Sequence, residues 1–399
     1  MELAVVPPLR RSLRPEKVPD PLRDRLAALI ETTALELLDP ERLAARAEDL
    51  RIKERDRVHP IGLIVDAMVL SALQRSTDTD GRLLDAQRTY EGIGGLASSK
   101  NSFRNNVRQA VPLMQDALQR RLTAMQASTN DLEMRGRLKA FSNVLIPDGC
   151  AFKLAAALSN VYAGTSQPAE LKLHAVYSVR AGGATSVKMA RGSEHDSDGF
   201  WPKTWEKNAL YIWDLGYVNN ERFVDAVQGG AHVLQRLKDS MNPVVLASYG
   251  PTGTRRELVD GQGKRLRLQE ACAFGDVHQQ AVLDLDVEIL DDKRRTAAAR
   301  VVCVPFGGED RYSLTTLPRA IFTPHDVAEL YRIRWEVELF FRGWRGAMRL
   351  DEVRRLSNPS TLAAAVLASL LAAVMAQEIT LGLKHLAAAQ AAQEAAFSP

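Results

Sequence analysis

The sequence predicts an α/β protein with an all-helical N-terminal domain, a mixed sheet, a β-rich block and a helical C-terminal region. Three changes in hydrophobic period carry this prediction. Residues 21–135 place apolar side chains at the i, i+3, i+4 spacing of amphipathic helices. After Arg137, apolar runs that end at Gly or Asp alternate with a short amphipathic helix, as in a mixed α/β sheet. Residues 239–322 alternate apolar and polar side chains between Gly and Asp turns, which is typical of antiparallel strands.

The composition is that of a soluble globular protein. The 399 residues are 46% hydrophobic and 25% charged, which is enough for two or three domains with a sizeable core. The formal net charge is only +3, so a nucleic-acid surface would have to come from local clustering of cations. Cys150, Cys272 and Cys303 lie far apart in the chain, which excludes a zinc ribbon or a disulfide scaffold and indicates a reducing compartment.

We expect no leader segment, no membrane span and no use of ATP. Residues 1–17 lack the apolar core of a signal peptide. The Ala- and Leu-rich run from Leu362 to Ala376 has 15 residues, too few to cross a bilayer, and a buried helix explains it better. The chain contains no GxxxxGK[ST] phosphate loop. Together these observations predict a cytoplasmic protein.

The N-terminal helices contain one candidate nucleic-acid contact. A Gly/Ser break precedes a new helix whose N-cap is either Ser99 or Ser102. From Lys100 to Met125 five cations face a single acid, and Lys100 and Arg104 lie at the helix start. Such a start suits phosphate contacts or a recognition helix in a DNA groove. A merely solvated basic helix explains the same pattern, and both interpretations stay open.

The region after Arg137 predicts buried strands that end at acids. The apolar run before Asp148 and the run before Asp214 both have this form. Between them, a strand pair is expected on either side of Gly182-Gly183, and a short helix and another strand follow at 219–238. An acid at the end of a buried strand is either paired by the fold or kept for metal chemistry.

The stretch from Tyr331 to Arg345 predicts a helix with two different faces. At about 100° per residue, Tyr331, Arg334, Glu338, Arg342 and Arg345 fall within an arc of roughly 80°. The apolar side chains fall on the neighbouring arc and would anchor the helix to a core. A salt-bridged surface explains the Glu and Arg spacing as well as an active site does, so the pattern alone leaves both open.

Asp148, Asp214 and Glu338 are the candidate metal ligands. Three carboxylates supply the hard oxygen donors that Mg²⁺ or Mn²⁺ prefers. Two such ions about 3.5–4 Å apart can hold the attacking and leaving oxygens of a phosphodiester displacement. The chain has 49 acidic residues, so many triples exist and spacing alone does not select this one.

A family resemblance does select it. LYRIRWEVELFFRGWR resembles the YREK signature of the insertion-sequence-4 family of DDE transposases, which is Tyr, two residues, Arg, three residues, Glu, six residues and Lys. Tyr331, Arg334 and Glu338 match this signature in register, and Arg345 stands in place of the Lys. IPDGC, LKLH, the His195-Asp196 pair and WDLGY resemble other family segments in the same order. The resemblance covers about residues 140–380.

The resemblance implies an RNase-H-like catalytic core. In it, Asp148, Asp214 and Glu338 would hold two Mg²⁺ or Mn²⁺ ions, and Tyr331 and Arg334 would hold DNA phosphates. Arg345 would do the same, with a planar fork replacing the compact ammonium of Lys. Arg342, Lys100 and Arg104 are further phosphate-binding candidates. The regions are then an N-terminal DNA-binding domain (1–135), the first part of the core (136–238), a β-rich insertion (239–323), and core helices with a helical tail (324–399).

The implied function is cut-and-paste DNA transposition in the nucleoid. The protein would bind the terminal inverted repeats of a mobile element, act as a homodimer on paired ends, and join those ends to target DNA. Two alternatives remain from other classes: a DNA-binding protein that no longer cuts, and a nuclease of the same fold that cuts without joining.

Weaker signals surround this set of residues. His174 and the His195-Asp196 pair could touch the site, although a structural role is favoured. Arg236 could contact DNA backbone or lie on a solvated edge. Trp335 and Trp344 are expected in or near the core.

Overall fold

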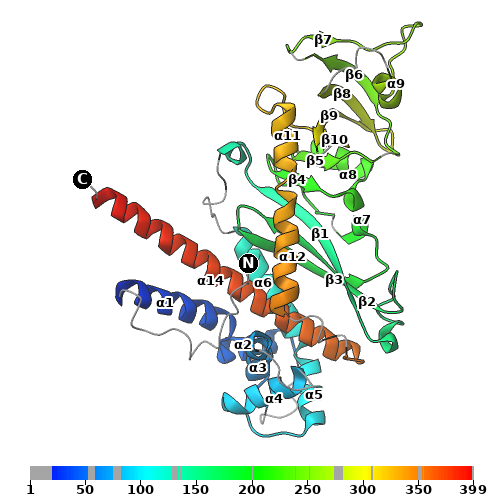
Figure 1. Ribbon diagram of the computed structural model, residues 1–399. Coiled ribbons are helices and arrows are strands. Elements are labelled where there is room, and N and C mark those ends of the chain that lie inside the picture. Colours follow the sequence, from blue (N-terminus) through cyan, green and yellow to red (C-terminus); the bar gives the residue numbers. More distant parts are fainter. Residues whose placement is uncertain are drawn as a thin grey trace. The chain divides into compact units, whose positions relative to one another are not determined.

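The computed structural model describes residues 20–52, 59–74, 82–127, 134, 136–199, 201–238, 240–250, 252–273, 282–306, 309–348, 353 and 355–397. The chain forms two compact units, which are described one at a time (Figure 1). We call residues 1–127, 152–170 and 342–399 the helical unit. Residues 128–151 and 171–341 form the sheet unit.

The helical unit confirms the helices expected from the N-terminal periodicity. Asp39 caps the second of them by accepting a hydrogen bond from the Glu41 amide at 3.0 Å. Ser99, and not Ser102, caps the fifth, since its hydroxyl accepts from the Ser102 amide at 3.2 Å. The elements are α1 (Asp20–Leu37), α2 (Pro40–Asp49), α3 (Ile61–Leu73), α4 (Arg82–Gly92), α5 (Lys100–Gln109), α6 (Val111–Ala127), η3 (Ala156–Leu158) and α14 (Pro359–Phe397).

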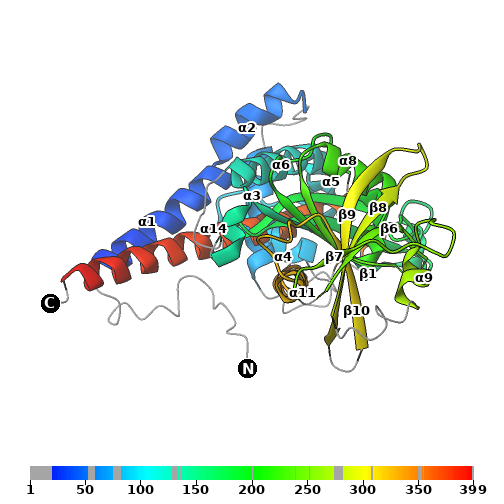
Figure 2. The ribbon, with the colours of Figure 1, turned by 90° about the horizontal axis from the view of Figure 1, so that it is seen from above.

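The long helix α14 is the centre of this unit. Its first half packs against α3 and α6, and α1 lies alongside its second half (Figure 1, Figure 2). Of the described helices, α14 is the one long and apolar enough to cross a membrane, and 67% of its apolar window is buried inside the protein. The expected 15-residue run is therefore part of a 39-residue helix, and the argument from its length was wrong. Burial in the core accounts for its composition instead.

The sheet unit contains one ten-stranded sheet in the order β3-β2-β1-β4-β5-β10-β9-β8-β6-β7. β1 pairs with β4, and β4 with β5, in parallel. From β5 onward in the sheet order, through β10, β9, β8, β6 and β7, each strand is antiparallel to the next. The strands are β1 (Val144–Lys153), β2 (Glu170–Ser178), β3 (Gly183–Arg191), β4 (Leu210–Trp213), β5 (His232–Arg236), β6 (Val244–Tyr249), β7 (Arg255–Arg256), β8 (Leu283–Leu290), β9 (Thr296–Phe306) and β10 (Glu309–Thr315). This mixed sheet confirms the predicted fold class and is consistent with an RNase-H-like core.

The β-rich block continues the same sheet. β10 pairs with β5, with Ser313 opposite Arg236, so β6 to β10 extend the parallel core rather than build a second sheet. The remaining elements of this unit connect the strands or pack on them. They are η2 (Gly136–Ala140), α7 (Asp196–Gly199), η4 (Leu215–Tyr217), α8 (Asn220–Gln228) and α9 (Leu268–Cys272).

The late helix is interrupted where the sequence predicted continuity. α11 (Pro324–Tyr331) ends at Tyr331, and α12 (Arg334–Met348) begins at Arg334. Between them the amides of Arg332 and Ile333 donate to carbonyls three residues earlier, which is the tighter 3₁₀ pattern. Tyr331 therefore does not share one helical arc with Glu338, and its position must be taken from its contacts.

Candidate active site

Two aspartates lie level with each other on neighbouring parallel strands. β1 and β4 pair with Val144 opposite Leu210, and Asp148 and Asp214 lie equally far along from these two residues. The charge of Asp214 also raises the pKa of Asp148, so the two carboxylates lie near each other. Asp214 follows β4 directly, as predicted, whereas β1 continues beyond Asp148 to Lys153.

Asp148 is a carboxylate with too few partners for its burial. Burial raises its pKa to about 6, while a hydrogen bond from the Gly149 amide to Oδ1, at 2.7 Å, opposes the rise. The nearby charges of Asp214 and Asp196 raise the pKa further, and that of Arg334 lowers it. A site that gathers carboxylates in this way would be stabilised by a cation.

Tyr331 reaches this edge of the sheet from the end of α11. Its hydroxyl lies 3.5 Å from Oδ1 of Asp214 and 3.4 Å from the carbonyl oxygen of Trp213. Burial raises the pKa of Tyr331, and the charge of Asp214 adds to the rise. The phenol is therefore a neutral hydrogen-bond donor at any ordinary pH.

Arg334 links the second aspartate to the predicted glutamate. Nη2 lies 2.7 Å from Oε1 of Glu338, and Nε lies 3.9 Å from Oδ1 of Asp214. Burial alone would lower the pKa of Arg334, but the neighbouring negative charges outweigh it and raise the pKa. One cation thus lies between two of the three predicted carboxylates.

The donor chemistry fits a divalent cation. Among the described residues, no three His, Cys, Asp or Glu side chains converge on a common point as a formed metal site. However, Asp148, Asp214 and Glu338 offer oxygen donors only, and the guanidinium of Arg334 already marks where positive charge is stabilised. Hard cations such as Mg²⁺ and Mn²⁺ take this kind of ligand.

A cavity of about 470 Å³ opens beside Asp214. It is lined by basic, aromatic and small side chains from β5, β9, β10, α11 and the start of α12. Those that bear on a nucleic-acid ligand are Arg236, Arg311, Arg332, Tyr312, Tyr331 and Trp335. Trp335 is 54% exposed, so its expected place in the core was wrong, whereas Trp344 is buried as expected. Arg236, for which the sequence allowed either a DNA contact or a solvated edge, lines the cavity.

Arg342 and Arg345, the last two arginines of the predicted phosphate-binding set on α12, have no described contact with the candidate site. Arg342 is exposed on α12 and belongs to the helical unit. The backbone of Arg345 lies in α12, but its side chain is outside the described part of the structure. The predicted phosphate contacts of both therefore stay predictions.

Lys100 and Arg104 lie exposed on the first turns of α5, in the helical unit. The opposite face of α5 buries Phe103 and Val107, and the Phe103 ring lies 5.6 Å from that of Tyr90 on α4. This packing fixes α5 with its basic start facing outward. The arrangement is compatible with a DNA contact.

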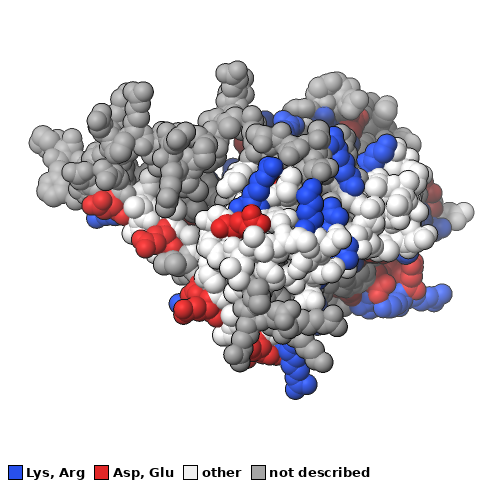
Figure 3. Space-filling view, turned by 90° about the horizontal axis from the view of Figure 1, so that it is seen from below, with Lys and Arg blue, Asp and Glu red and all other residues white. Residues whose placement is uncertain are grey.

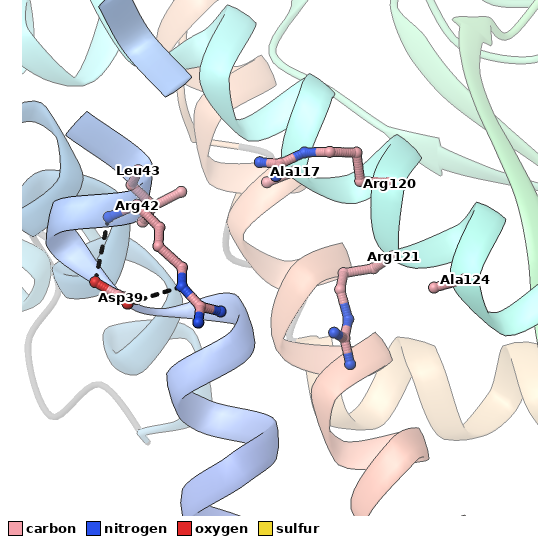
Figure 4. Close-up of a pocket in the computed structure, with 7 residues that line it drawn as sticks. All are labelled: Asp39, Arg42, Leu43, Ala117, Arg120, Arg121 and Ala124. Carbon is pink, nitrogen blue, oxygen red and sulfur yellow. Dashed lines mark hydrogen bonds and ion pairs between the residues drawn. The ribbon is translucent and has the colours of Figure 1, made fainter. Parts of the chain in front are cut away.

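A second group of arginines in the helical unit has a different character. A cavity of about 240 Å³ lies between α2 and α6. Figure 4 shows the residues that line it, among them Arg42, Arg120 and Arg121. Each arginine is paired: Arg42 with Asp39 at 3.2 Å, Arg120 with Asp116 at 2.8 Å, and Arg121 with Glu378. Of these three pairs, only that of Arg121 with Glu378 links two helices, α6 and α14. Because each arginine already has an acidic partner, this cavity offers little to an anion.

Basic side chains do not merge into one continuous surface on the face drawn in Figure 3. Among the residues coloured there, Lys and Arg lie in separate groups between uncharged side chains. This agrees with the low net charge of +3.

His174 and His195 lie in different surroundings. His174 is 3% exposed, and its Nδ1 lies 3.3 Å from the Tyr217 hydroxyl, next to Gly149. His195 is exposed and bonds Ser197 instead, at 2.8 Å. His174 thus lies beside the candidate site, and His195 makes a local turn contact.

The sequence patterns did not single out Lys172 and Arg222, two residues that lie around the aspartates. Asp196 was named as a residue that could touch the site, together with His195. Lys172 donates to Oδ1 of Asp196 at 3.0 Å, and Arg222 is fully buried. Two sequence features could have drawn attention to them: Lys172 lies within an apolar strand, and Arg222 lies on the apolar face of α8.

Comparison with known proteins identifies the family of this chain. Residues 142–375 match the family model described as a transposase DDE domain. The chain is 21% identical over 255 residues to the transposase for insertion sequence element IS231F of Bacillus thuringiensis subsp. israelensis, covering 55% of this chain and 53% of that protein. It is 21% identical over 253 residues to the transposase for insertion sequence element IS1151 of Clostridium perfringens, covering 54% and 52% respectively.

A shorter match is closer in sequence. It is 36% identical over 66 residues to the putative transposase InsL for insertion sequence element IS186A of Escherichia coli K12, covering 16% of this chain and 18% of that protein. The chain spans about half the length of the two longer matches among these curated relatives. The family model covers more than half of this chain. The protein described here therefore belongs to the family of transposase DDE domains.

Proposed function

We propose that this protein is a transposase that cuts the ends of a mobile DNA element and joins them to target DNA. The observation that carries the proposal is the cluster in which the charge of Asp214 acts on Asp148 and Arg334 lies between Asp214 and Glu338. All of these residues lie within the region that matches the DDE domain. Membership of the insertion-sequence-4 group, with its YREK signature at Tyr331, Arg334, Glu338 and Arg345, is part of the proposal.

Asp148, Asp214 and Glu338 would hold two Mg²⁺ or Mn²⁺ ions. Such ions, when bound, activate the attacking oxygen and stabilise the charge that develops on the phosphate. Asp148 is presented by β1, and Asp214 is the residue that follows β4. Glu338 approaches from a helix, and its position depends on the ion pair with Arg334.

Arg334 and Tyr331 would position the scissile phosphate. A guanidinium offers several donors in one plane and matches phosphate oxygens well. The Tyr331 hydroxyl, near Asp214, can donate to a further phosphate oxygen. In the first step water attacks phosphorus and the 3′-oxygen leaves as a hydroxyl. In the second step that 3′-hydroxyl attacks a phosphodiester of the target, and another 3′-oxygen leaves.

The substrate would be double-stranded DNA with terminal inverted repeats. Lys100 and Arg104 on α5 would contact DNA backbone through the N-terminal domain (residues 1–135), and Arg342 and Arg345 would add contacts near the site. The core would comprise residues 136–238 and the helices after 324, with the β-rich insertion at 239–323 between them. A homodimer would bring two ends together, with no need for ATP.

Glutamate substitution on α12 tests the proposal. Purified protein is incubated with Mg²⁺ and with DNA that carries the sequences flanking its gene, and cleaved and joined products are separated by electrophoresis. We expect Glu338→Gln to reduce cleavage by at least about 10²-fold while DNA binding persists. Glu336→Gln is the matched control, because Glu336 is exposed on the same helix and should cut like the wild type.

Each outcome has a distinct meaning. Cleavage with joining by the wild type supports a transposase, and cleavage without joining supports a nuclease. DNA binding with neither activity supports a non-cutting DNA-binding protein. If Glu338→Gln cuts at the wild-type rate, the assignment of the three carboxylates is wrong.

A further inference from the structure

One carboxylate outside the predicted set touches the backbone next to both aspartates. Asp196 begins α7, and a Cβ added at Gly149 would lie 3.2 Å from its Oδ1. A Cβ added at Gly216 would lie 2.8 Å from its Oδ2. Gly149 directly follows Asp148, and Gly216 lies just after Asp214. The carboxylate of Asp196 is thus wedged between the two segments that present the candidate ligands.

Lys172 fixes the orientation of this carboxylate. Its Nζ donates to Oδ1 of Asp196 at 3.0 Å and to the carbonyl oxygen of Glu194 at 2.7 Å. The Lys172 side chain is only 15% exposed, so the pair is partly shielded from water. Because Lys172 lies on β2, which neighbours β1 in the sheet, the strands themselves hold the lysine in place.

A second wall of the same cradle is formed by His174 and Tyr217. A Cβ at Gly149 would lie 3.2 Å from Nδ1 of His174 and 3.3 Å from the Tyr217 hydroxyl. Tyr217 is buried, and its amide donates to the carbonyl oxygen of Asp214 at 2.9 Å. A side chain at position 149 would press on these groups, and they would have to shift by a few tenths of an ångström to admit it.

The segment that carries Asp196 is tied to the turn after Asp214 by a buried arginine. Arg222 is 0% exposed and donates to the carbonyl oxygen of Tyr217 at 3.1 Å and to that of Ser197. Its guanidinium lies 4.9 Å from the ring centre of Trp201. Both ends of the contact between Asp196 and Gly216 are therefore held by one rigid side chain.

We propose that Asp196, oriented by Lys172, is a positioning residue that sets the separation of Asp148 and Asp214. It would act through the backbone at Gly149 and Gly216 and would contact neither DNA nor ion. This inference rests on the proposed function, because it concerns the geometry of the same carboxylates. Groups that orient metal ligands typically change metal affinity or activity by about 10- to 100-fold when removed.

The variants are chosen to separate shape from charge. Asp196→Ala removes the wedge, whereas Asp196→Asn keeps its shape and can still accept a hydrogen bond from Lys172. Asp198→Ala is the matched control on the same short helix, because no Cβ added at Gly149 or Gly216 would have Asp198 among its nearest neighbours. Circular dichroism and the melting midpoint without metal establish that each variant is folded.

Two readouts are compared. The first is the Mg²⁺ concentration that gives half-maximal DNA cleavage, which we expect to rise about 10- to 100-fold in Asp196→Ala and to change little in Asp196→Asn. The second is the rise of the melting midpoint with Mg²⁺ in the absence of DNA, which follows the affinity of the folded state for the ion. Asp196→Ala should need more Mg²⁺ for the same rise, and Asp198→Ala should match the wild type.

A second route tests the contact itself. Gly216→Ala keeps the Asp196 charge but forces the carboxylate away, so it should also raise the required Mg²⁺ concentration. Combined with Asp196→Ala it should add little further, because the Oδ2 contact at 2.8 Å is gone and only the Cβ of residue 196 remains, at 3.2 Å. This arm also serves if Asp196→Ala fails to fold.

The outcomes distinguish this inference from the proposed function. If the wild type fails to cut DNA, the proposed function fails, while the melting readout still tests Asp196. The inference is overturned if folded Asp196→Ala keeps the wild-type Mg²⁺ dependence, or if Mg²⁺ leaves wild-type melting unchanged. Additive effects of Gly216→Ala and Asp196→Ala would overturn it as well.

Discussion

Asp148 and Asp284 are both shielded carboxylates on the same sheet, yet their surroundings differ sharply. Asp284 on β8 accepts from Nε and Nη2 of Arg300 at 2.6 Å each, and from Nε and Nη2 of Arg319 at 2.9 and 2.8 Å. Burial would raise the pKa of Asp284, but these arginines outweigh it and lower the pKa. Asp148 has one backbone donor and neighbouring acids, and burial raises its pKa to about 6.

The difference shows how a buried carboxylate that stabilises the fold can be told from one that is a candidate for catalysis. Around Asp284 the fold supplies a cation for every buried negative charge, which closes a structural network. Around Asp148 it brings further carboxylates and leaves the charge unbalanced, which a fold has no structural reason to do. Both carboxylates lie within the region that matches the DDE domain, so it is the difference in charge balance that marks Asp148 as the candidate for chemistry.

The largest expected effect is a loss of stability when Asp284 is replaced. Asp284→Asn leaves Arg300, which is 4% exposed, without its bidentate carboxylate. We expect a loss of about 3–5 kcal/mol in the free energy of unfolding, measured by urea denaturation. A loss below about 1 kcal/mol, the scale of exposed ion pairs, would show that this network is not structural.

The next effect concerns Arg334 in the candidate active site. Arg334→Lys keeps the charge, but a single ammonium cannot span Glu338 and Asp214 as the guanidinium does. We expect cleavage to fall by about 10²-fold with little change in stability. Arg191→Lys on β3, which is exposed, is the control and should be neutral. Equal cleavage by Arg334→Lys and the wild type would remove Arg334 from the site.

A smaller effect is expected at Tyr331. Its hydroxyl makes only long contacts in the structure, at 3.4 and 3.5 Å, so it adds little to stability. Loss of one hydrogen bond of about 1–1.5 kcal/mol in the transition state predicts a roughly tenfold slower cleavage by Tyr331→Phe. Single-turnover rates on labelled DNA would measure it, and a drop beyond about 10²-fold would indicate a role in the chemistry itself.

Much of the sheet and part of the site follow from local sequence patterns. The apolar runs before Asp148 and Asp214 specify buried strands, and parallel pairing then brings both acids to one edge. The capping of α5 by Ser99 and the burial of Trp344 also follow from local rules. Glu338 was placed correctly on a helix because its neighbours keep a clear period.

What failed depends on contacts between distant segments. The turn at Arg332 and Ile333 interrupts a periodic pattern that gives no local warning of a break. Trp335 lies at the wall of a cavity, so its apolar character did not indicate burial. Asp196 gains its place only through glycines far away in the chain, Gly149 and Gly216. Such contacts leave no period in the sequence.

The most direct test of this contrast is the free energy of unfolding of Asp148→Asn against pH. A folded-state pKa of about 6, against the ordinary value of 3.8, corresponds to about 3 kcal/mol of destabilisation when Asp148 is charged. Because the folded pKa is raised, the wild type should lose stability relative to Asp148→Asn as the pH rises from about 4 to about 6. The variant should then be the more stable protein at pH 7, by up to about 3 kcal/mol, and the difference should vanish below pH 4. A wild type that is more stable than Asp148→Asn at pH 7, or a difference independent of pH, would contradict the account.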